Sequence, residues 1–316
     1  MVGLARREPR TASELRSDAQ GGALCHCCII IDMTSRREFL QATSLAAALS
    51  VSGRAAQLKT LGVQLYTVRD VLPKKPQETL DAIRAIGYQE AEATYAGLDD
   101  LWPALERSGL KPVSIHLDST SVTKGKPDDL SPIFDKLKQR GFQYAVFPYL
   151  PEPERGGIEV IQAVAEKFNR AGEKCRAAGM TFCYHNHAFE FATEKGATLF
   201  QVMLDHTDPK LVAFELDAFW VSVAGLDPAE FIRKLSGRVP LMHLKDKAQG
   251  TAVMYKESVP RTAFKEVGSG VMDFPKLLRA AAAAGVAHYF VEQDQTPGDP
   301  VESLRKSFGY LSKLNY

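Results

Sequence analysis

The chain has 316 residues and nearly balanced charge, with 39 Lys and Arg against 38 Asp and Glu and a formal net charge of +1. This balance excludes the strongly basic surface that nucleic-acid binding requires, so we expect no nucleic-acid partner. Beyond the N-terminal leader described next, no apolar run reaches the roughly 18 residues of a membrane span. We therefore expect no membrane span in the mature protein.

The first recognisable pattern lies over residues 33–56, which contain SRREFL followed by an Ala-rich stretch and small residues up to Ala56. The paired Arg36 and Arg37 in this order are typical of a twin-arginine signal peptide. We expect this segment to be removed and the mature protein to be periplasmic or otherwise exported. Residues 1–32 show no hydrophobic periodicity and are interpreted as a start assigned too early or a disordered extension.

Residues 57–316 alternate short β-rich runs with amphipathic stretches, which indicates parallel strand–helix units. Several helical stretches end at a glycine just before the next run, as at Gly87 and Gly285. No G-x-G-x-x-G turn follows the first run, which argues against a dinucleotide-binding sheet. The eight runs predict an α/β fold with a single-domain (β/α)₈ TIM barrel. The expected strands lie within 61–68, 88–94, 111–118, 143–150, 181–188, 211–220, 240–247 and 287–294.

An enzyme of this fold places its chemistry at the C-terminal ends of the strands. Four polar residues end consecutive expected strands, from the fifth to the eighth, and we expect them to converge: His185, Asp217, His243 and Glu292. Two imidazoles and two carboxylates suit a divalent metal ion such as Mn²⁺, Co²⁺, Zn²⁺ or Fe²⁺, with Mg²⁺ as a further candidate. The sequence thus predicts a metal site at the barrel mouth.

Five motifs carry a resemblance to a known family: QLYTVRD, YHNHAFEF, ELDAFW, HLKD and VGSGVMDF. With them, residues 61–312 resemble the sugar phosphate isomerase/epimerase family, whose barrel is xylose isomerase-like. The resemblance implies one metal held by Glu, Asp, His and Glu from strands five to eight. Asp217, His243 and Glu292 match the last three, whereas His185 stands where relatives often have Glu. That exchange argues against an epimerisation shared symmetrically between two carboxylates, and Glu190 is a candidate to restore the missing one.

The resemblance also implies proton abstraction next to the carbonyl of a sugar. Glu292 is predicted as the main proton-transfer group, with His185, Glu190 and Lys245 completing the catalytic set. Export and the lack of an evident phosphate cradle favour a free sugar, a keto-sugar or a glycoside over a sugar phosphate. The residues predicted to bind this small-molecule sugar substrate are Tyr66, Glu92, His116, His187, Trp220 and Lys247.

The first expected function is therefore a metal-dependent isomerase or epimerase of a free sugar or keto-sugar. A metal-dependent lyase, dehydratase or hydratase of an oxidised sugar or glycoside uses the same first step and is the alternative. A non-catalytic periplasmic sugar-binding barrel is a third hypothesis, and near-neutral charge disfavours a DNA-repair endonuclease with this barrel. The sequence indicates no oligomeric state.

Overall fold

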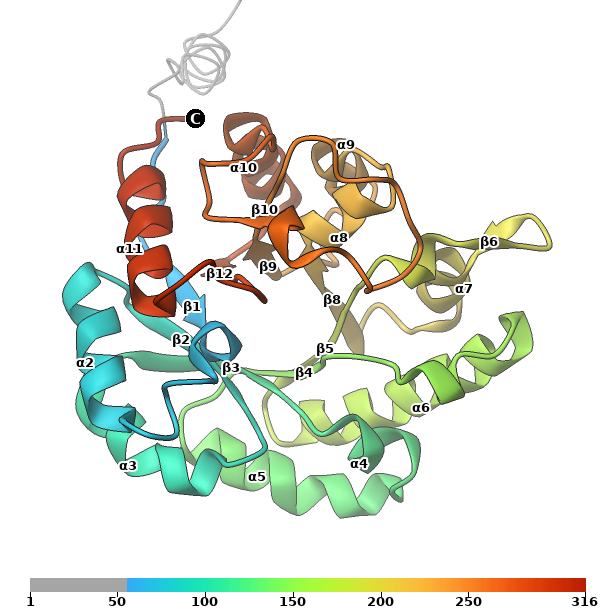
Figure 1. Ribbon diagram of the computed structural model, residues 1–316. Helices are drawn as coiled ribbons and strands as arrows, with labels where there is room; N and C mark the ends of the chain where they lie inside the picture. The colour runs from blue at the N-terminus through green and yellow to red at the C-terminus, as the bar shows by residue number, and fades with distance from the viewer. Residues whose placement is uncertain (1–55) are drawn as a thin grey trace, which may run out of the picture. The chain divides into compact units, whose positions relative to one another are not determined.

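The computed structural model describes residues 56–316, so the predicted extension and all but the last residue of the predicted leader lie outside the described part. Eight parallel strands close into a barrel in the order β1-β12-β9-β8-β5-β4-β3-β2, which confirms the predicted single-domain TIM barrel (Figure 1). The barrel strands are β1 (Gly62–Gln64), β2 (Glu90–Thr94), β3 (Lys111–His116), β4 (Tyr144–Phe147), β5 (Thr181–His185), β8 (Val212–Asp217), β9 (Leu241–Leu244) and β12 (His288–Val291).

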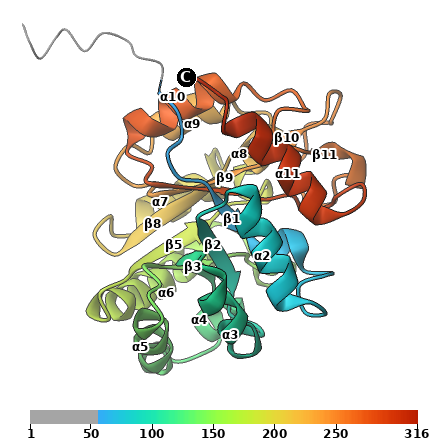
Figure 2. The ribbon, with the colours of Figure 1, turned by 90° about the vertical axis from the view of Figure 1, so that its left-hand side faces the viewer.

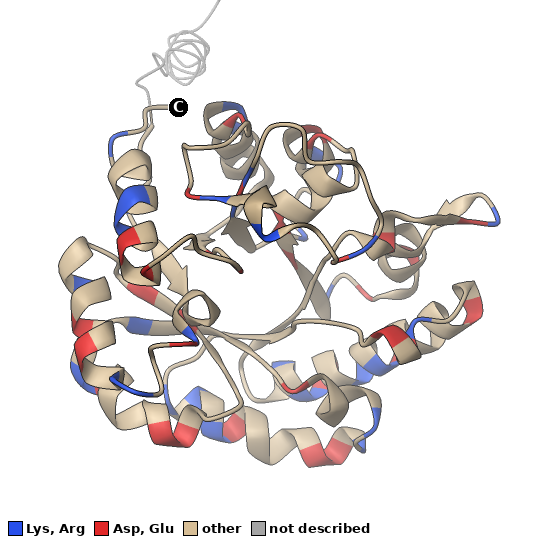
Figure 3. Ribbon diagram, viewed as in Figure 1, with Lys and Arg blue, Asp and Glu red and all other residues tan. Residues whose placement is uncertain are grey.

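Helices surround the barrel in both views (Figures 1 and 2). They are α2 (Pro76–Ile86), α3 (Leu98–Ser108), α4 (Ser119–Thr123), α5 (Ser131–Gln139), α6 (Ile158–Ala177), α7 (Leu199–His206), α8 (Ala218–Val223), α9 (Pro228–Arg233), α10 (Phe274–Ala284) and α11 (Pro300–Leu311). The long α6 shows why they pack there, because Ile161, Val164 and Phe168 recur at helical spacing and are all buried. Charges of both signs are interspersed over the outer helices (Figure 3). No described helix is long and apolar enough to cross a membrane.

All the expected strands except β2 end earlier than predicted, and in two of them the last strand residue caps a short helix. Asp217 ends β8, and its Oδ1 accepts a hydrogen bond from the Trp220 backbone N–H at 3.0 Å, which begins α8. Gln64 ends β1, and its Oε1 accepts one from the Tyr66 N–H at 3.0 Å, which begins a 3₁₀ turn over Leu65–Val68. The caps turn the chain outward where the cavity begins.

The barrel interior is filled by an apolar layer beneath a polar one. Cys183, Leu241 and Phe290 are fully buried in one hydrophobic cluster. Each lies two residues before a predicted site residue, and a strand repeats its facing every two residues, so the apolar layer is the floor of the site. Gly62 is required beside it, because a Cβ there would approach Phe290 Cδ1 to 2.4 Å.

Two antiparallel two-stranded sheets lie beside the barrel strands in sequence. β6 (Thr193–Glu194) pairs with β7 (Ala197–Thr198), and β10 (Asp246–Lys247) pairs with β11 (Phe264–Lys265). The segment between β10 and β11, residues 248–263, contributes Glu257, Val259 and Arg261 to the wall of the cavity described next.

Candidate active site

A cavity of about 720 Å³ opens where the C-terminal ends of the barrel strands meet. Its inner wall carries ionisable side chains, and aromatic rings including Tyr66, Tyr95, Tyr149 and Trp220 lie around it. This volume falls within the range of small-molecule sites, and aromatic faces beside polar groups suit a sugar ring. Among the predicted site residues, those that line the cavity are Tyr66, His116, His185, His187, Trp220, Lys245 and Glu292.

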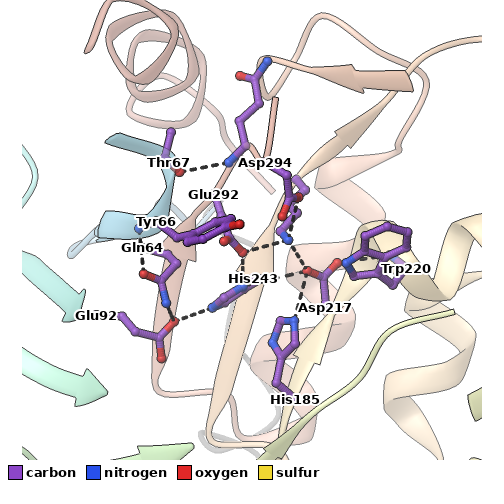
Figure 4. A network of polar contacts seen from close by, with 12 residues as sticks. Gln64, Tyr66, Thr67, Glu92, His185, Asp217, Trp220, His243, Glu292 and Asp294 are labelled. Carbon is purple, nitrogen blue, oxygen red and sulfur yellow. Dashed lines mark hydrogen bonds and ion pairs between the residues drawn. The ribbon is translucent and has the colours of Figure 1, made fainter. Parts of the chain in front are cut away.

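The structure brings together three of the four predicted metal ligands. Asp217, His243 and Glu292 are buried, and one possible ligand atom from each lies within 4.8 Å of the others. The fourth residue, His185, stands beside them with Nε2 at 3.7 Å from Asp217 Oδ2 (Figure 4). These donors come from β5, β8, β9 and the end of β12, so they could hold a metal ion at one point.

Both histidines of this group have one ring nitrogen held by a carboxylate deeper in the barrel. His243 Nε2 lies 2.5 Å from Glu92 Oε2, while its Nδ1 lies 2.8 Å from Glu292 Oε2 (Figure 4). His185 Nδ1 lies 3.1 Å from Glu215 Oε2, which leaves Nε2 on the side of Asp217. A carboxylate behind a histidine is the usual support of a metal-binding imidazole.

The two oxygens of the Asp217 carboxylate have different surroundings. Its Oδ1 caps α8, whereas Oδ2 is buried, accepts no hydrogen bond within residues 56–316 and lies 3.0 Å from the Lys245 ammonium. A buried carboxylate oxygen that accepts no hydrogen bond and is held only by an ion pair can also be held by a metal ion. The present residues therefore fit a divalent ion.

One cation of the chain already lies against this oxygen. Lys245 Nζ is 3.0 Å from Asp217 Oδ2, 2.7 Å from Glu292 Oε2 and 2.9 Å from Asp294 Oδ2. Burial alone would lower the pKa of Lys245, but the three carboxylates outweigh it and raise the pKa well above its ordinary value. The lysine is thus an ammonium that neutralises the cluster, and an incoming metal ion must compete with it.

The charge states of Glu292 and His185 differ, although both side chains line the cavity. Burial opposes ionisation of Glu292, but Lys245 and His243 outweigh it and hold its pKa well below the usual range. Burial lowers the pKa of His185 well below its ordinary value, so this imidazole is neutral. Burial would also lower the pKa of His116, yet Glu92 and Glu215 raise it to about 10. A neutral base on β5 therefore faces an anionic carboxylate at the end of β12.

Three predicted residues lie elsewhere than expected. Glu92, predicted to bind substrate hydroxyls, is fully buried and holds His243 instead. Glu190, the candidate to replace the missing carboxylate, is turned away from the cavity, since its Oε1 accepts hydrogen bonds from Tyr184 Oη at 2.6 Å and from the His187 N–H at 2.8 Å. Lys247 donates to the Ser222 carbonyl at 2.8 Å and lines a separate cavity of about 390 Å³.

Two predicted substrate-binding residues keep unused polar atoms. His187 Nδ1 and Trp220 Nε1 are buried and have no hydrogen-bond partner among the described residues. Both residues line the cavity, and their rings lie 5.2 Å apart. They are positioned to contact a polar ligand at this wall.

The motifs HLKD and VGSGVMDF meet in space through Asp246. Its carboxylate accepts backbone hydrogen bonds from Gly268 at 2.9 Å, Gly270 at 2.8 Å and Met272 at 3.2 Å. A Cβ on Gly270 would lie 2.3 Å from Asp246 Oδ1, which explains the glycine. These residues fix the segment after β11 rather than lining the cavity.

Some residues of the site had no role assigned from the sequence. Glu215 was visible as a strand-end carboxylate, and its position two residues before Asp217 places it on the same face of β8. That alternation is the signal that could have found it. Gln64 Nε2 donates to Glu92 Oε2 at 2.8 Å, but an amide at the end of a short strand carries no comparable signal.

The fold and the site define a xylose isomerase-like barrel with a polar mouth. The family model for the xylose isomerase-like TIM barrel matches residues 80–314, and the chain belongs to this family. The chain is 29% identical over 270 residues to an inosose dehydratase of Geobacillus thermodenitrificans, which covers 82% of this chain and 78% of that one. A match to an inosose dehydratase of Bacillus cereus, 27% identical, spans 53% of that protein.

Among solved structures, a sugar phosphate isomerase/epimerase from Parabacteroides distasonis superposes with a TM-score of 0.63 at 27% identity. The superposition covers 83% of this chain and 96% of that one. The chain is therefore similar both to a dehydratase and to an isomerase/epimerase.

Proposed function

We propose that this protein is a metal-dependent enzyme that abstracts a proton next to the carbonyl of a keto-sugar and then eliminates water from it. The observation that carries the proposal is the contact of 2.7 Å between Lys245 Nζ and Glu292 Oε2 at the cavity wall. It places a carboxylate base beside an ammonium acid, and elimination uses one group of each kind. The likeness to an inosose dehydratase supports the same outcome.

The residues that would hold the ion are His185, Asp217, His243 and Glu292. A bound divalent ion would polarise the carbonyl and stabilise the negative charge that develops on its oxygen. Glu92 and Glu215 would keep the two imidazoles oriented. The backbone N–H of Trp220 would hold Oδ1 of Asp217.

Glu292 and Lys245 together would supply both proton transfers of the elimination. Glu292 takes the proton from the carbon next to the carbonyl, and the electron pair of that bond forms a carbon–carbon double bond. The bond to the β-oxygen breaks, and Lys245 donates the proton that lets this oxygen leave as water. The proton on Glu292 can then return to Lys245 across their 2.7 Å contact, so the site is restored without net proton uptake.

Isomerisation or epimerisation, the first expectation from the sequence, is the second candidate. It is favoured by His185, which is neutral and lies at the cavity wall beside Asp217. A neutral imidazole there can exchange a proton with the opposite face of the substrate, and the likeness to an isomerase/epimerase agrees.

Incubation of the purified protein with keto-inositols and with free and keto-sugars in D₂O, followed by NMR and mass spectrometry, tests the proposal. Elimination gives a product that has lost one water, whereas epimerisation gives deuterium at one carbon without loss of mass as water. The variant Glu292→Gln should lose this activity, and Glu90→Gln is its matched control. Glu90 is also a buried glutamate paired with a histidine, His288 at 2.8 Å, but it lies at the opposite end of the barrel. If no added substrate exchanges a proton or loses water with the metal-loaded protein, the proposal is wrong.

We also propose that the protein acts outside the cytoplasm. The support is the SRREFL pattern at Arg36 and Arg37. Fractionation of cells that express the chain with both arginines changed to lysine is the test. Accumulation of the variant in the cytoplasm is expected, and unchanged export would contradict the proposal.

A further inference from the structure

We infer that Glu215 is a positioning residue that selects which ring nitrogen of His185 faces the metal ion. The inference rests on the proposed metal site. It concerns a buried carboxylate that lies one layer below the ligands and lines no part of the cavity.

The contact between the two residues determines the tautomer of the imidazole. His185 Nδ1 lies 3.1 Å from Glu215 Oε2, and a carboxylate can only accept there, so Nδ1 carries the proton. Nε2 then keeps its lone pair and lies 3.7 Å from Asp217 Oδ2. Without this contact, a neutral imidazole is free to place its proton on either nitrogen.

The structure contains a competing arrangement of donors. His116, His185, Glu215 and His243 have ligand atoms within 4.8 Å of one another and could hold an ion deeper in the barrel. The deeper site would use His185 Nδ1 and His243 Nε2, while the mouth site uses His185 Nε2 and His243 Nδ1. One nitrogen cannot donate a proton and bind a metal, so the tautomers decide between the two sites.

The hydrogen bonds favour the mouth. His243 Nε2 lies 2.5 Å from Glu92 Oε2, which commits this nitrogen to a proton. His116 Nε2 lies 2.9 Å from Glu215 Oε2 and 3.2 Å from Glu92 Oε2, so it donates to both carboxylates. All three imidazoles thus direct N–H groups at the deeper carboxylates. At the mouth, His243 Nδ1 lies 2.8 Å from Glu292 Oε2 and Lys245 Nζ lies 3.0 Å from Asp217 Oδ2, so a metal ion there would replace one proton and one ammonium.

Charge gives Glu215 a second effect. A histidine on β5 in place of a glutamate removes one negative charge from the ligand set. Glu215 supplies that charge from behind the His185 ring. A carboxylate that is hydrogen-bonded to Nδ1 raises the basicity of Nε2, the nitrogen that would bind the metal. The pair His185–Glu215 therefore takes the place of a single carboxylate.

Two measurements that compare Glu215→Gln with the wild type test the inference. The first is ¹⁵N NMR of the histidine side chains in the metal-free protein. In the wild type we expect the His185 Nδ1–H tautomer, and in Glu215→Gln a mixture or the Nε2–H form. The second is Co²⁺ and Zn²⁺ affinity by competition with a chromophoric chelator, which should fall roughly 10- to 100-fold in Glu215→Gln while the Co²⁺ spectrum keeps its type.

Three further variants separate the outcomes. Asp217→Asn should lose most of the metal affinity, His116→Asn should change it only a few-fold, and Glu90→Gln should match the wild type. The inference is overturned by a wild-type His185 protonated on Nε2, or by equal tautomers and equal affinity in Glu215→Gln. Metal binding that survives Asp217→Asn but not His116→Asn would make Glu215 a ligand of the deeper site. A wild type that binds no metal refutes the proposed function, while the tautomer measurement still decides the role of Glu215.

Discussion

Lys245 Nζ lies 2.7 Å from Glu292 Oε2, in the space between Glu292 and Asp217 where a divalent ion would bind. The lysine side chain is 2% exposed, so its charge is compensated only by its neighbours. The barrel mouth therefore contains its own cation, and metal loading and protein stability are linked through this side chain.

The first prediction concerns Lys245→Met. In the metal-free protein this change leaves three carboxylates without their ammonium, and loss of one partner of a buried ion pair costs about 3–5 kcal/mol of unfolding free energy. A divalent ion then has no competitor, so Zn²⁺ and Mn²⁺ should bind more tightly and stabilise the variant more than the wild type. Thermal denaturation with and without each ion measures both effects.

Lys247→Met is the control, because Lys247 lies two residues further along the chain and its ammonium donates to the Ser222 backbone carbonyl, with no ion pair to a carboxylate among the described residues. Its metal-dependent stabilisation should equal that of the wild type. Unchanged metal affinity in Lys245→Met would show that the lysine does not compete with the ion.

The second prediction concerns Glu292→Gln. An amide of the same size cannot accept the substrate proton, and loss of a positioned general base lowers the rate about 10²- to 10⁴-fold. Metal affinity should fall less, since three ligands remain. Proton exchange of the substrate in D₂O and metal titration give the two values. Retained exchange in Glu292→Gln, together with loss of exchange in a metal-loaded His185→Ala, would assign the proton transfer to His185.

The third prediction is a dependence of stability on pH through Glu190. Burial raises the pKa of Glu190 from 4.5 to about 7. The folded state then binds this proton more tightly than the unfolded state, so the contribution to stability is full below pH 4.5 and is lost as the pH rises through 7. The difference corresponds to about 3 kcal/mol.

Glu190→Gln keeps the shape but does not titrate. The unfolding free energy of the variant relative to the wild type, from urea denaturation at a series of pH values, should therefore rise from pH 5 to pH 8. A difference that stays constant over this range would mean that Glu190 is ionised throughout.

Periodicity predicted the eight strands and the polar mouth because buried parallel strands are continuous apolar runs and the polar residues end them. His185, Asp217, His243 and Glu292 were found this way, since strand order alone brings neighbouring strand ends together. The side-chain directions beyond the strands could not be predicted. Glu190 and Lys247 follow strands β5 and β9 closely, but a 3₁₀ turn directs one toward Tyr184 and a hairpin directs the other toward Ser222.

The contacts of Lys245 were also not predicted from the sequence. The sequence placed it after a predicted ligand and assigned it to the catalytic set. Two of its three carboxylate partners, Glu292 and Asp294, follow the next strand around the barrel, and the pairing of β9 with β12 brings them within 3 Å. The cation that competes with the metal was therefore not visible in the local pattern.

The last prediction concerns the segment 248–263 at the cavity wall. Arg155, from the loop before α6, forms an ion pair of 2.7 Å with Glu257 in this segment and lies over the Phe189 ring at 3.6 Å. Glu257 lines the cavity, so the pair connects the segment to the opposite side of the mouth. We expect Arg155→Gln to loosen that wall and to raise KM several-fold while kcat changes less, because the pair touches none of the proton-transfer groups. Arg233→Gln, which removes an exposed ion pair with Glu230 on α9, should leave both constants unchanged. Equal KM values for the wild type and Arg155→Gln would show that the segment takes no part in holding the substrate.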